Sequence, residues 1–315
     1  MRVRPMLTVL AGGVGAAKFL RGLIRSADPA AITIVVNTAD DDRFFGLAVS
    51  PDLDTVTYTL AGVSHRHRGW GLDDDRFQCL EALRRLYQGA GWFQLGDKDL
   101  ATHIYRTDRL AEGATLSTVT AELCRAFGVT TRVLPMSDQP VRTVLTTRAG
   151  RLSFQQYLVA HRARPTVRAV TYRGATAARP APGVLTAIRE AQAVIIAPSN
   201  PFLSIGPILA VPGIRRALRA RRGPVVAVSP LVGGRAVTGP LGRLLRRFGY
   251  PTSSLGIAYC YRPFLDALVI DRRDRADAAS LEQTGCRAIL ADTVLSTPAR
   301  AARVAGTVLH ALGLA

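Results

Sequence analysis

The sequence has few cysteines, only two lysines, and no apolar run long enough to cross a lipid bilayer. Its four cysteines lie far apart and form no C-x-x-C pair, which argues against a disulfide framework and a structural zinc site. It also lacks a G-x-S-x-G motif, and no histidine follows a cysteine at a spacing typical of a nucleophile and its base. Residues 1–10 run directly into an apolar strand instead of a signal peptide's long apolar core, so we expect a cytoplasmic protein with no membrane partner.

Positive charge is in excess, because 41 lysines and arginines against 23 acidic residues give a formal net charge of +18. A basic surface attracts nucleic-acid phosphates, so a nucleic-acid-binding protein, whose binding would fall steeply with salt, is one alternative. The arginines, however, are scattered singly and in pairs, which is typical of codon use in a GC-rich genome. We therefore expect a small anionic substrate and no nucleic-acid partner. The two lysines, Lys18 and Lys98, lie within motifs, where a compact point charge replaces the usual arginine.

Strand and helix patterns alternate along the 315 residues, whose 48% hydrophobic and 20% charged content is typical of a globular protein. Continuous apolar, β-branched runs predict buried parallel strands at 31–36, 193–197 and 224–228. Between residues 141 and 172, short alternating runs predict a different kind of β-structure. Helical patterns are expected at 16–26, 73–86, 100–107, 115–127 and 183–191.

This alternation predicts an α/β fold: a Rossmann-like three-layer sandwich with a mostly parallel sheet and a smaller β-rich or helical insertion. Residues 1–140 would form the N-terminal part of the core and residues 183–315 the C-terminal part. Residues 141–182 would form the insertion or subdomain.

The stretch 7–18 reads as a strand, a glycine-rich turn and the start of a helix. Gly12, Gly13 and Gly15 lack a Cβ, so backbone N–H groups could approach a phosphate closely at the positive end of the helix. The pattern is only half of a dinucleotide fingerprint, and Lys18 is too close for a P-loop. An anion site and a plain tight turn therefore both remain open at this point.

Five carboxylates lie within fifteen residues, on a predicted strand end and a predicted helix start. Mg²⁺ takes one or two protein carboxylates together with waters and substrate phosphates, so we expect it on Asp40, Asp41 and Asp54. Asp42, and with less reason Asp52, would instead cap a helix or solvate a loop. An acceptor hydroxyl would also need a general base, for which Asp40 and Asp54 are the candidates.

A second polar loop, containing Ser199 and Asn200, follows the predicted strand at 193–197. Phosphoryl transfer needs its charge neutralised and its nucleophile aimed, with little covalent work from the protein. The glycine loop, Lys18, an Mg²⁺ on aspartates and this second loop would together meet those needs.

Several motifs occurring in order resemble the 2-phospho-L-lactate transferases of coenzyme F-420 biosynthesis, including actinobacterial forms that use phosphoenolpyruvate. The resemblance covers almost the whole chain and rests on GGVGAAK at 12–18, VNTADD at 36–41, SPDLDT at 50–55, LGDKDLATH at 95–103, LPMSDQPVRT at 134–143, PSNPFLSIGPILAVPG at 198–213 and VSPLVGG at 228–234.

The resemblance implies a Mg²⁺-dependent transfer from a guanosine-diphospho-linked three-carbon acid to the ribityl hydroxyl of a deazaflavin precursor, with release of GMP. It implies that Asp54 contacts the deazaflavin or the metal, and that the glycine loop and the loop of Ser199 and Asn200 hold the donor. It places Asp97 and Lys98 beside the substrate and agrees with a homodimer. A sugar-nucleotide-binding regulator of the same superfamily is the alternative.

Overall fold

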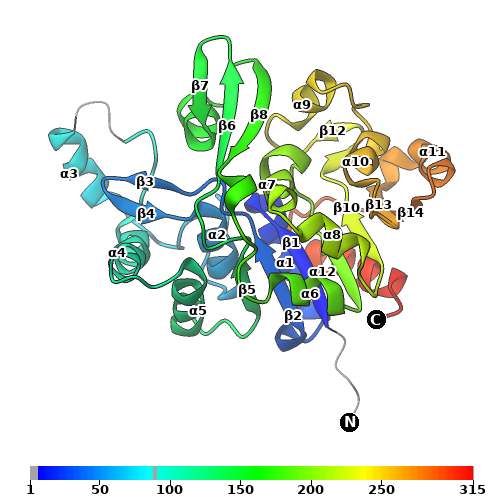
Figure 1. Ribbon diagram of the computed structural model, residues 1–315, viewed down its shortest axis with the longest axis horizontal. Helices are drawn as coiled ribbons and strands as arrows, with labels where there is room; N and C mark the ends of the chain where they lie inside the picture. The colour runs from blue at the N-terminus through cyan, green and yellow to red at the C-terminus, as the bar shows by residue number, and fades with distance from the viewer. Residues whose placement is uncertain (1–5, 88–90, 315) are drawn as a thin grey trace.

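A parallel sheet of seven strands forms the centre of the computed structural model, which describes residues 6–87 and 91–314 (Figure 1). Residues 1–5 and 315, which belong to the two predicted parts of the core, lie outside the described residues. The strand order is β14-β13-β10-β9-β1-β2-β5. The strands are β1 (Leu7–Ala11), β2 (Ile32–Val36), β5 (Arg132–Pro135), β9 (Ala193–Ile196), β10 (Val225–Val228), β13 (Ala267–Asp271) and β14 (Arg287–Ala291).

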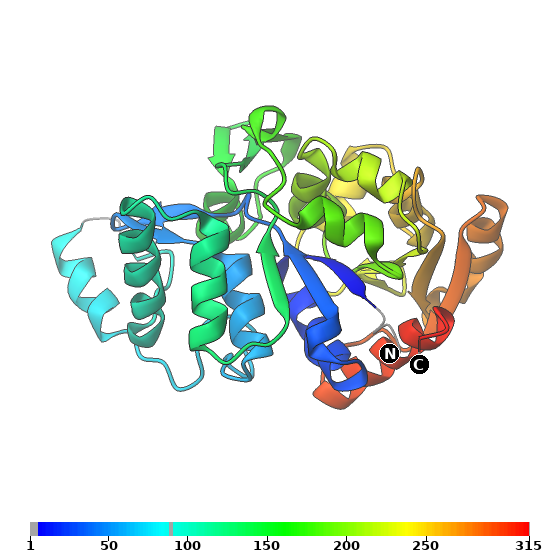
Figure 2. The same cartoon turned by 60° about the horizontal axis from the view of Figure 1, so that its bottom comes forward.

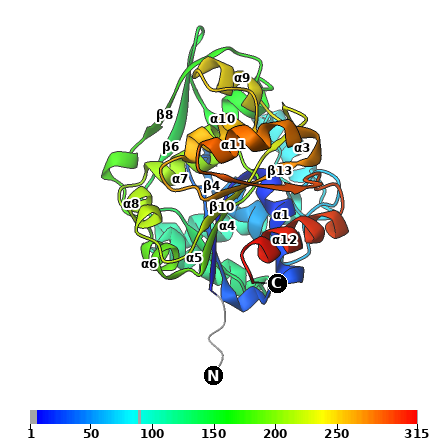
Figure 3. The same cartoon turned by 90° about the vertical axis from the view of Figure 1, so that its right-hand side faces the viewer.

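Helices cover both faces of this sheet, because its side chains alternate and both faces are apolar. Val9 and Ile34 pack on one face, beneath α1 (Gly13–Ser26), α2 (Pro51–Leu60), α5 (Leu116–Ala126) and α12 (Pro298–Ala311). Leu10 and Val35 pack on the other, beneath α6 (Val184–Glu190), α7 (Gly206–Ala210), α8 (Ile214–Arg219), α9 (Leu241–Arg247), α10 (Ser254–Tyr261) and α11 (Ala278–Gln283). Figure 3 shows α1 and α12 on one side of β10 and α6 and α8 on the other. The predicted three-layer α/β sandwich is therefore confirmed.

Helices α1 and α12 approach each other closely at Gly22, where a Cβ would lie 2.2 Å from the carbonyl carbon of Ala301. Only glycine permits this contact, so the first helix of the chain is packed directly against a helix near its other end. Within the described residues, no helix is both long enough and apolar enough to span a membrane.

The chain reverses its direction across the sheet at β1, which pairs in parallel with β2 on one side and with β9 on the other. Such a switch point opens a crevice at the carboxyl ends of the two central strands, where ligands of open α/β sheets bind. Gly12 follows β1, and Ser199 lies three residues after β9 ends. The topology therefore brings the two predicted phosphate-binding loops to one crevice.

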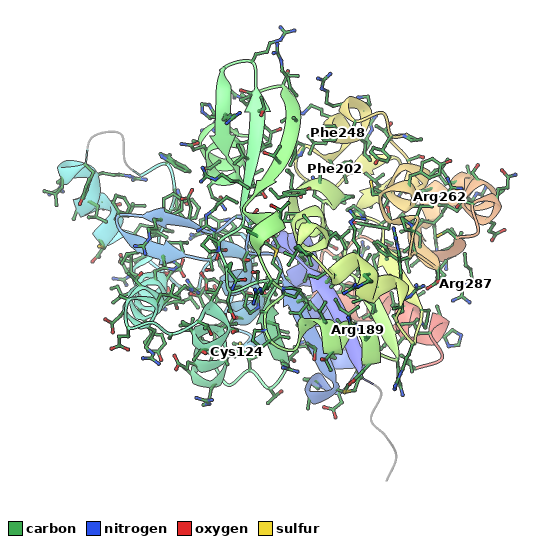
Figure 4. All side chains as sticks on the ribbon, viewed as in Figure 1. Cys124, Arg189, Phe202, Phe248, Arg262 and Arg287 are labelled. Atoms are coloured by element: carbon green, nitrogen blue, oxygen red, sulfur yellow. The ribbon has the colours of Figure 1, made fainter. Side chains whose placement is uncertain are left out.

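The β-rich segment is confirmed as a small antiparallel sheet that projects from the parallel one (Figures 1 and 2). Its order is β7-β6-β8, with bounds β6 (Arg142–Thr147), β7 (Gly150–Ser153) and β8 (Val167–Arg173). A satellite hydrophobic cluster anchors it to the core, because Leu145 of the insertion belongs to the same cluster as Leu203 of the core. Phe202 and Phe248, both from the core, pack against this cluster with ring centroids 5.0 Å apart (Figure 4). The insertion therefore sits on the loop that follows Asn200.

The helix predicted at 73–86 is shorter than expected, because α3 (Gln78–Leu86) begins five residues later. Asp74 has a positive φ of 52°, which a helix cannot accommodate. The Asp75 carboxylate accepts two backbone N–H groups in the first turn of α4 (Asp97–Ala111), at 2.8 and 3.1 Å. Long-range capping of α4 thus overrides the local helical pattern.

A short hairpin that the sequence pattern does not indicate follows the carboxylate-rich end of β2. It consists of β3 (Asp42–Phe44) and β4 (Leu47–Val49), joined by Phe45 and Gly46 with positive φ values of 53° and 80°. Two positive φ values in succession match the twist of a tight hairpin turn. Strands of three residues are too short to show a period in sequence.

Candidate functional site

A cavity of about 700 Å³ lies at the switch point of the sheet and is large enough for a small-molecule substrate. Its walls come from the ends of β1, β2 and β9, from α2 and α4, and from the insertion. The sequence-predicted site residues that line it are Gly12, Gly13, Gly15, Lys18, Asp40, Asp54, Ser199 and Asn200.

The Asp52 side chain, on α2, accepts a hydrogen bond from the glycine loop. The Gly13 N–H donates to Asp52 Oδ1 at 2.8 Å, and Asn37 Nδ2 donates to Asp52 Oδ2 at 2.9 Å. Burial raises the pKa of Asp52 to about 6, although these two hydrogen bonds act in the opposite direction. Asp52 therefore joins β2, α2 and the turn at Gly13 instead of capping its own helix.

The second loop packs against the glycine loop without space for a side chain between them. A Cβ on Gly15 would lie 2.5 Å from the Pro198 carbonyl oxygen, and Ser199 Oγ donates to the Gly12 carbonyl at 2.9 Å. Asn200 Oδ1 accepts the N–H groups of the next turn at 2.9 and 3.2 Å. The two loops therefore form one rigid wall of the cavity.

Gly15→Ala is expected to destabilise the protein by about 1–3 kcal/mol, because the added methyl group would collide with a backbone carbonyl that cannot move freely. Gly306→Ala is the matched control, since a Cβ at that position in α12 would meet nothing within 4 Å. It should stabilise the protein by roughly 0.5–1 kcal/mol. Denaturant unfolding measures both effects, and equal stability of the two variants would contradict the close approach of the loops.

Asp40 and Asp41 are buried at the turn after β2 and lack full hydrogen bonding. The Oδ1 atom of each is buried with no hydrogen-bond partner among the described residues, while Asp41 Oδ2 accepts Ser50 Oγ at 2.8 Å. Burial and the nearby Asp52 raise the pKa of Asp40 well above its ordinary value, and burial raises the pKa of Asp41 to about 7. This end of the cavity therefore favours a proton or a cation on its carboxylates.

Asp54 is held by Arg106, a residue that sequence reasoning missed. The Arg106 side chain, which is 2% exposed, donates from Nη1 to Asp54 Oδ2 at 3.1 Å and from Nη2 to Asp54 Oδ1. This paired geometry fixes the orientation of the carboxylate. Asp54 therefore enters the cavity wall in one defined position.

The same buried network continues along α4. Arg106 Nη1 lies 3.3 Å from His103 Nδ1, and His103 Nε2 lies 3.3 Å from Asp99 Oδ2. Tyr58 on α2 donates its hydroxyl hydrogen to Asp99 Oδ1 at 2.6 Å. The spacing of Asp99, His103 and Arg106 by four and three residues places them on one helix face. That polar stripe is the signal by which the sequence could have indicated this network.

Asp97 and Lys98 are not brought together with the other predicted site residues. The Asp97 carboxylate accepts the N–H groups of Gln78 and Cys79 at 3.1 and 3.0 Å, at the start of α3. Lys98 Nζ donates to the Asp73 carbonyl at 3.2 Å, and neither side chain lines the cavity. Both side chains are instead used at the junction of α3 and α4.

Within residues 6–87 and 91–314, no group of three or more His, Cys, Asp or Glu side chains is arranged to hold a metal ion. The three predicted metal ligands, Asp40, Asp41 and Asp54, do not all face the cavity. Asp41 accepts a hydrogen bond from Ser50 and does not line the cavity. Asp40 and Asp54 do line it, and the unpartnered buried oxygen of Asp40 is of the ligand type that Mg²⁺ prefers. Two carboxylates facing a substrate cavity fit a cation that completes its coordination with water and phosphate.

Aromatic side chains form another part of the wall. Trp70, Trp92 and Phe93 line the cavity, and Phe93 stacks on Phe44 of the β3–β4 hairpin with ring centroids 3.9 Å apart. Arg68 lies over the Trp70 ring, 5.5 Å from its centroid. The cavity thus combines one end lined by the glycine loop and Lys18 with flat apolar surfaces suited to a ring system.

Comparison with known proteins identifies relatives along nearly the whole chain. The model of the family described as 2-phospho-L-lactate transferase CofD matches residues 7–301. A 2-phospho-L-lactate transferase of Methanosarcina mazei is 41% identical over 305 residues, covering 97% of this chain and 100% of the relative. A phosphoenolpyruvate transferase of Streptomyces griseus is 44% identical over 290 residues, covering 90% of this chain and 91% of the relative.

The fold is also similar to the crystal structure of protein BH3568 from Bacillus halodurans. The TM-score is 0.64 at 19% identity, with 98% of this chain and 100% of the other covered, so this likeness concerns the fold alone. The sequence relatives and the family match extend over both loops and the buried carboxylates described above. The chain therefore belongs to the 2-phospho-L-lactate transferase CofD family.

Proposed function

We propose that this protein transfers a phosphoenolpyruvyl or 2-phospholactyl group from a guanosine-diphospho-linked three-carbon acid to an alcohol in coenzyme F-420 biosynthesis. The acceptor is the ribityl hydroxyl of 7,8-didemethyl-8-hydroxy-5-deazariboflavin, and GMP leaves. Family membership supports the transferase activity, and the names of its relatives support these two groups. The observation that carries the proposal is that the glycine loop, the loop of Ser199 and Asn200, and buried carboxylates face one cavity.

In this proposal the donor phosphates bind at the rigid wall made by the two loops. The Gly13 N–H already donates a hydrogen bond to Asp52. The next N–H groups at the start of α1 would therefore be the ones that bind a phosphate. Lys18, on the same helix, adds a point charge beside them. Hydrogen bonds from rigid backbone groups orient the donor without further reorganisation of the loop.

Asp40 and Asp54 are the residues that would hold Mg²⁺, which when bound neutralises charge on the transferred phosphate. Both oxygens of Asp54 accept hydrogen bonds from Arg106, whereas Asp40 Oδ1 has no partner among the described residues. An oxygen that is free of other donors is the better proton acceptor. We therefore assign to Asp40 Oδ1 the removal of the proton from the attacking hydroxyl, which leaves the other oxygen of Asp40 for the cation, and to Asp54 a fixed position beside the reacting phosphate.

The acceptor ring would lie against the aromatic wall, where Trp70, Trp92 and Phe93 offer flat apolar faces. We also propose that the enzyme is a homodimer, which analytical ultracentrifugation measures directly. Its mass is 33.8 kDa per chain, so a dimer sediments as a particle of twice that mass.

The decisive assay mixes the purified protein with Mg²⁺, the deazaflavin alcohol and one guanylated acid at a time. Phosphoenolpyruvyl, phospholactyl and phosphoglyceryl donors are compared, and GMP and an acidic flavin product are quantified by chromatography. The expected result is that GMP and flavin product appear in equal amounts with at least one donor. Absence of GMP with all three donors would refute the proposed function.

Mg²⁺ alone is expected to raise the melting temperature of the wild-type protein, because it would neutralise the buried Asp40 carboxylate, whose Oδ1 has no hydrogen-bond partner among the described residues. Asp40→Asn should lose most of this response. In a chelator the variant should unfold no more readily than the wild type, since the amide removes a buried group whose charged form is disfavoured. Differential scanning calorimetry with and without Mg²⁺ measures both effects, and an unchanged response in Asp40→Asn would exclude Asp40 as a ligand.

A further inference from the structure

Arg162 and Ala163, in the insertion, adopt a backbone conformation that side chains rarely tolerate. Their φ values are 50° and 52°, and they are the one consecutive pair of non-glycine residues with positive φ in the described part of the chain. Residues of this kind persist only where the surrounding structure holds them, and they cluster at functional sites. Contacts with the surrounding structure must therefore hold Arg162 and Ala163 in this conformation.

Three contacts hold this turn in place. The Ala163 N–H donates to the Tyr157 carbonyl at 2.8 Å, and the Arg162 N–H donates to the Val159 carbonyl at 3.3 Å. Arg243 on α9 donates to the Ala163 carbonyl, and the Ala163 side chain is buried in the satellite cluster with Tyr157. Contacts from the insertion and from the core together therefore fix the backbone conformation of Arg162 and Ala163.

Arg162 lines the cavity and is also exposed to solvent. Lys18 and Arg162 are the two lysine or arginine residues among the described residues that line it. No side chain in the described ranges pairs with the Arg162 guanidinium, whereas Arg106 is fully engaged with Asp54. The cavity is therefore lined by one cationic side chain beside the glycine loop, Lys18, and by a second, unpaired one on the insertion, Arg162.

The insertion is also tied to the carboxylate end of the cavity. Gln155, which is 4% exposed, donates from Nε2 to the backbone carbonyl of Asp40 at 3.3 Å. Gln155 and Arg162 both line the cavity and lie on either side of a single turn. Arg162 is thus positioned by the same segment that contacts the strand end carrying Asp40.

We propose that Arg162 binds the carboxylate of the three-carbon acid, an inference that rests on the function proposed above. The donor carries a diphosphate and one carboxylate, and the two loops with Lys18 already serve the phosphates. The carboxylate lies next to the ester oxygen on the reacting phosphorus, so it must sit near Asp40. A planar guanidinium matches a carboxylate with two parallel hydrogen bonds, which a lysine cannot provide.

The test compares the phospholactyl donor with guanosine diphosphate isopropyl ester, in which a methyl group replaces the carboxylate. Arg162→Gln should lower kcat/KM for the acid about 10- to 100-fold, the typical effect of losing a charge-assisted hydrogen-bonded pair. Its kcat/KM for the isopropyl ester should stay close to the wild-type value. Arg162→Lys should fall between the wild type and Arg162→Gln, because it keeps the charge without the paired geometry.

Arg164→Gln is the matched control, because Arg164 is an exposed arginine two residues away that does not line the cavity. It should leave both donors unaffected, and unchanged melting temperatures will show that all variants are folded. Equal losses for the acid and the isopropyl ester in Arg162→Gln would overturn the proposal, since they would assign Arg162 to a phosphate. No loss with either donor would overturn it as well.

Failure of the underlying function gives a different result. A wild-type protein that neither releases GMP from the acid donors nor binds them by calorimetry would refute the transferase proposal and this inference with it. Wild-type turnover with an unselective Arg162→Gln effect would refute the inference alone. Wild-type turnover with a loss confined to carboxylate-bearing donors would support both.

Discussion

Asp54→Asn is expected to lower kcat about 10²- to 10⁴-fold, corresponding to several kcal/mol of lost charge stabilisation at the reacting phosphate. The amide keeps the shape of the side chain but lacks the charge that would hold Mg²⁺ in the cavity. Steady-state release of GMP, with saturating donor and acceptor, measures this loss. The effect should appear in kcat more than in the KM of the donor, because in the proposed mode of binding the two loops, and not Asp54, would hold the donor phosphates.

Asp42→Asn provides the control within the same acidic stretch. Asp42 does not line the cavity, and its Oδ1 atom accepts the N–H of the adjacent Arg43 at 2.9 Å. Its turnover should remain at the wild-type level. A wild-type kcat for Asp54→Asn, or equal losses in the two variants, would remove Asp54 from the reacting centre.

Arg106→Met is expected to cost about 3–5 kcal/mol of unfolding free energy, because it leaves the Asp54 carboxylate buried without its cation. Denaturant unfolding monitored by circular dichroism measures this change. Arg109→Met is the matched control, since Arg109 lies one turn further along α4 and pairs at a partly exposed site with Glu112 and Glu122. Because solvent screens that exposed network, Arg109→Met should lose much less stability than Arg106→Met.

The double variant Asp54→Asn with Arg106→Met separates stability from catalysis. Removing both charges eliminates the unpaired group that each single change leaves behind, so part of the lost stability should return. Turnover should not return, because the carboxylate is still missing. Strictly additive stability losses would show that the two side chains do not interact in solution.

The sheet and its ligand-binding end follow from short-range sequence signals. The β-branched run at 31–36 and the apolar run at 193–197 correspond to β2 and β9, which flank β1. Gly12 and Ser199 follow such runs, and parallel strands bring their carboxyl ends to one edge. The polar loops that follow these strands therefore indicated the edge of the sheet at which the cavity lies.

Not every residue of a predicted site motif lines the cavity. Asp97 and Lys98 stand in the same motif as Asp99 and His103, yet only the latter two line the cavity. Neighbouring residues on a helix point in different directions, so a motif matched as a string does not say which of its members reach the substrate. Arg106 was missed because it lies outside the matched string, although on the same helix face.

Arg162 illustrates a second limit of sequence reasoning. It appears in the sequence as one of many scattered arginines, which composition alone attributes to codon use. Its distinguishing property is a positive φ imposed by Tyr157, Val159 and Arg243, and no local pattern encodes that combination. Backbone geometry, and not residue type, separates it from its neighbours.

The close contact between Gly22 of α1 and Ala301 of α12 has a consequence for biosynthesis. During translation the amino-terminal strand emerges long before β9, its second neighbour, and before the helix that covers α1. Pairings between distant segments form slowly, because the long intervening chain must first be ordered. The nascent protein therefore leaves the side of α1 that faces α12 uncovered until α12 has left the ribosome.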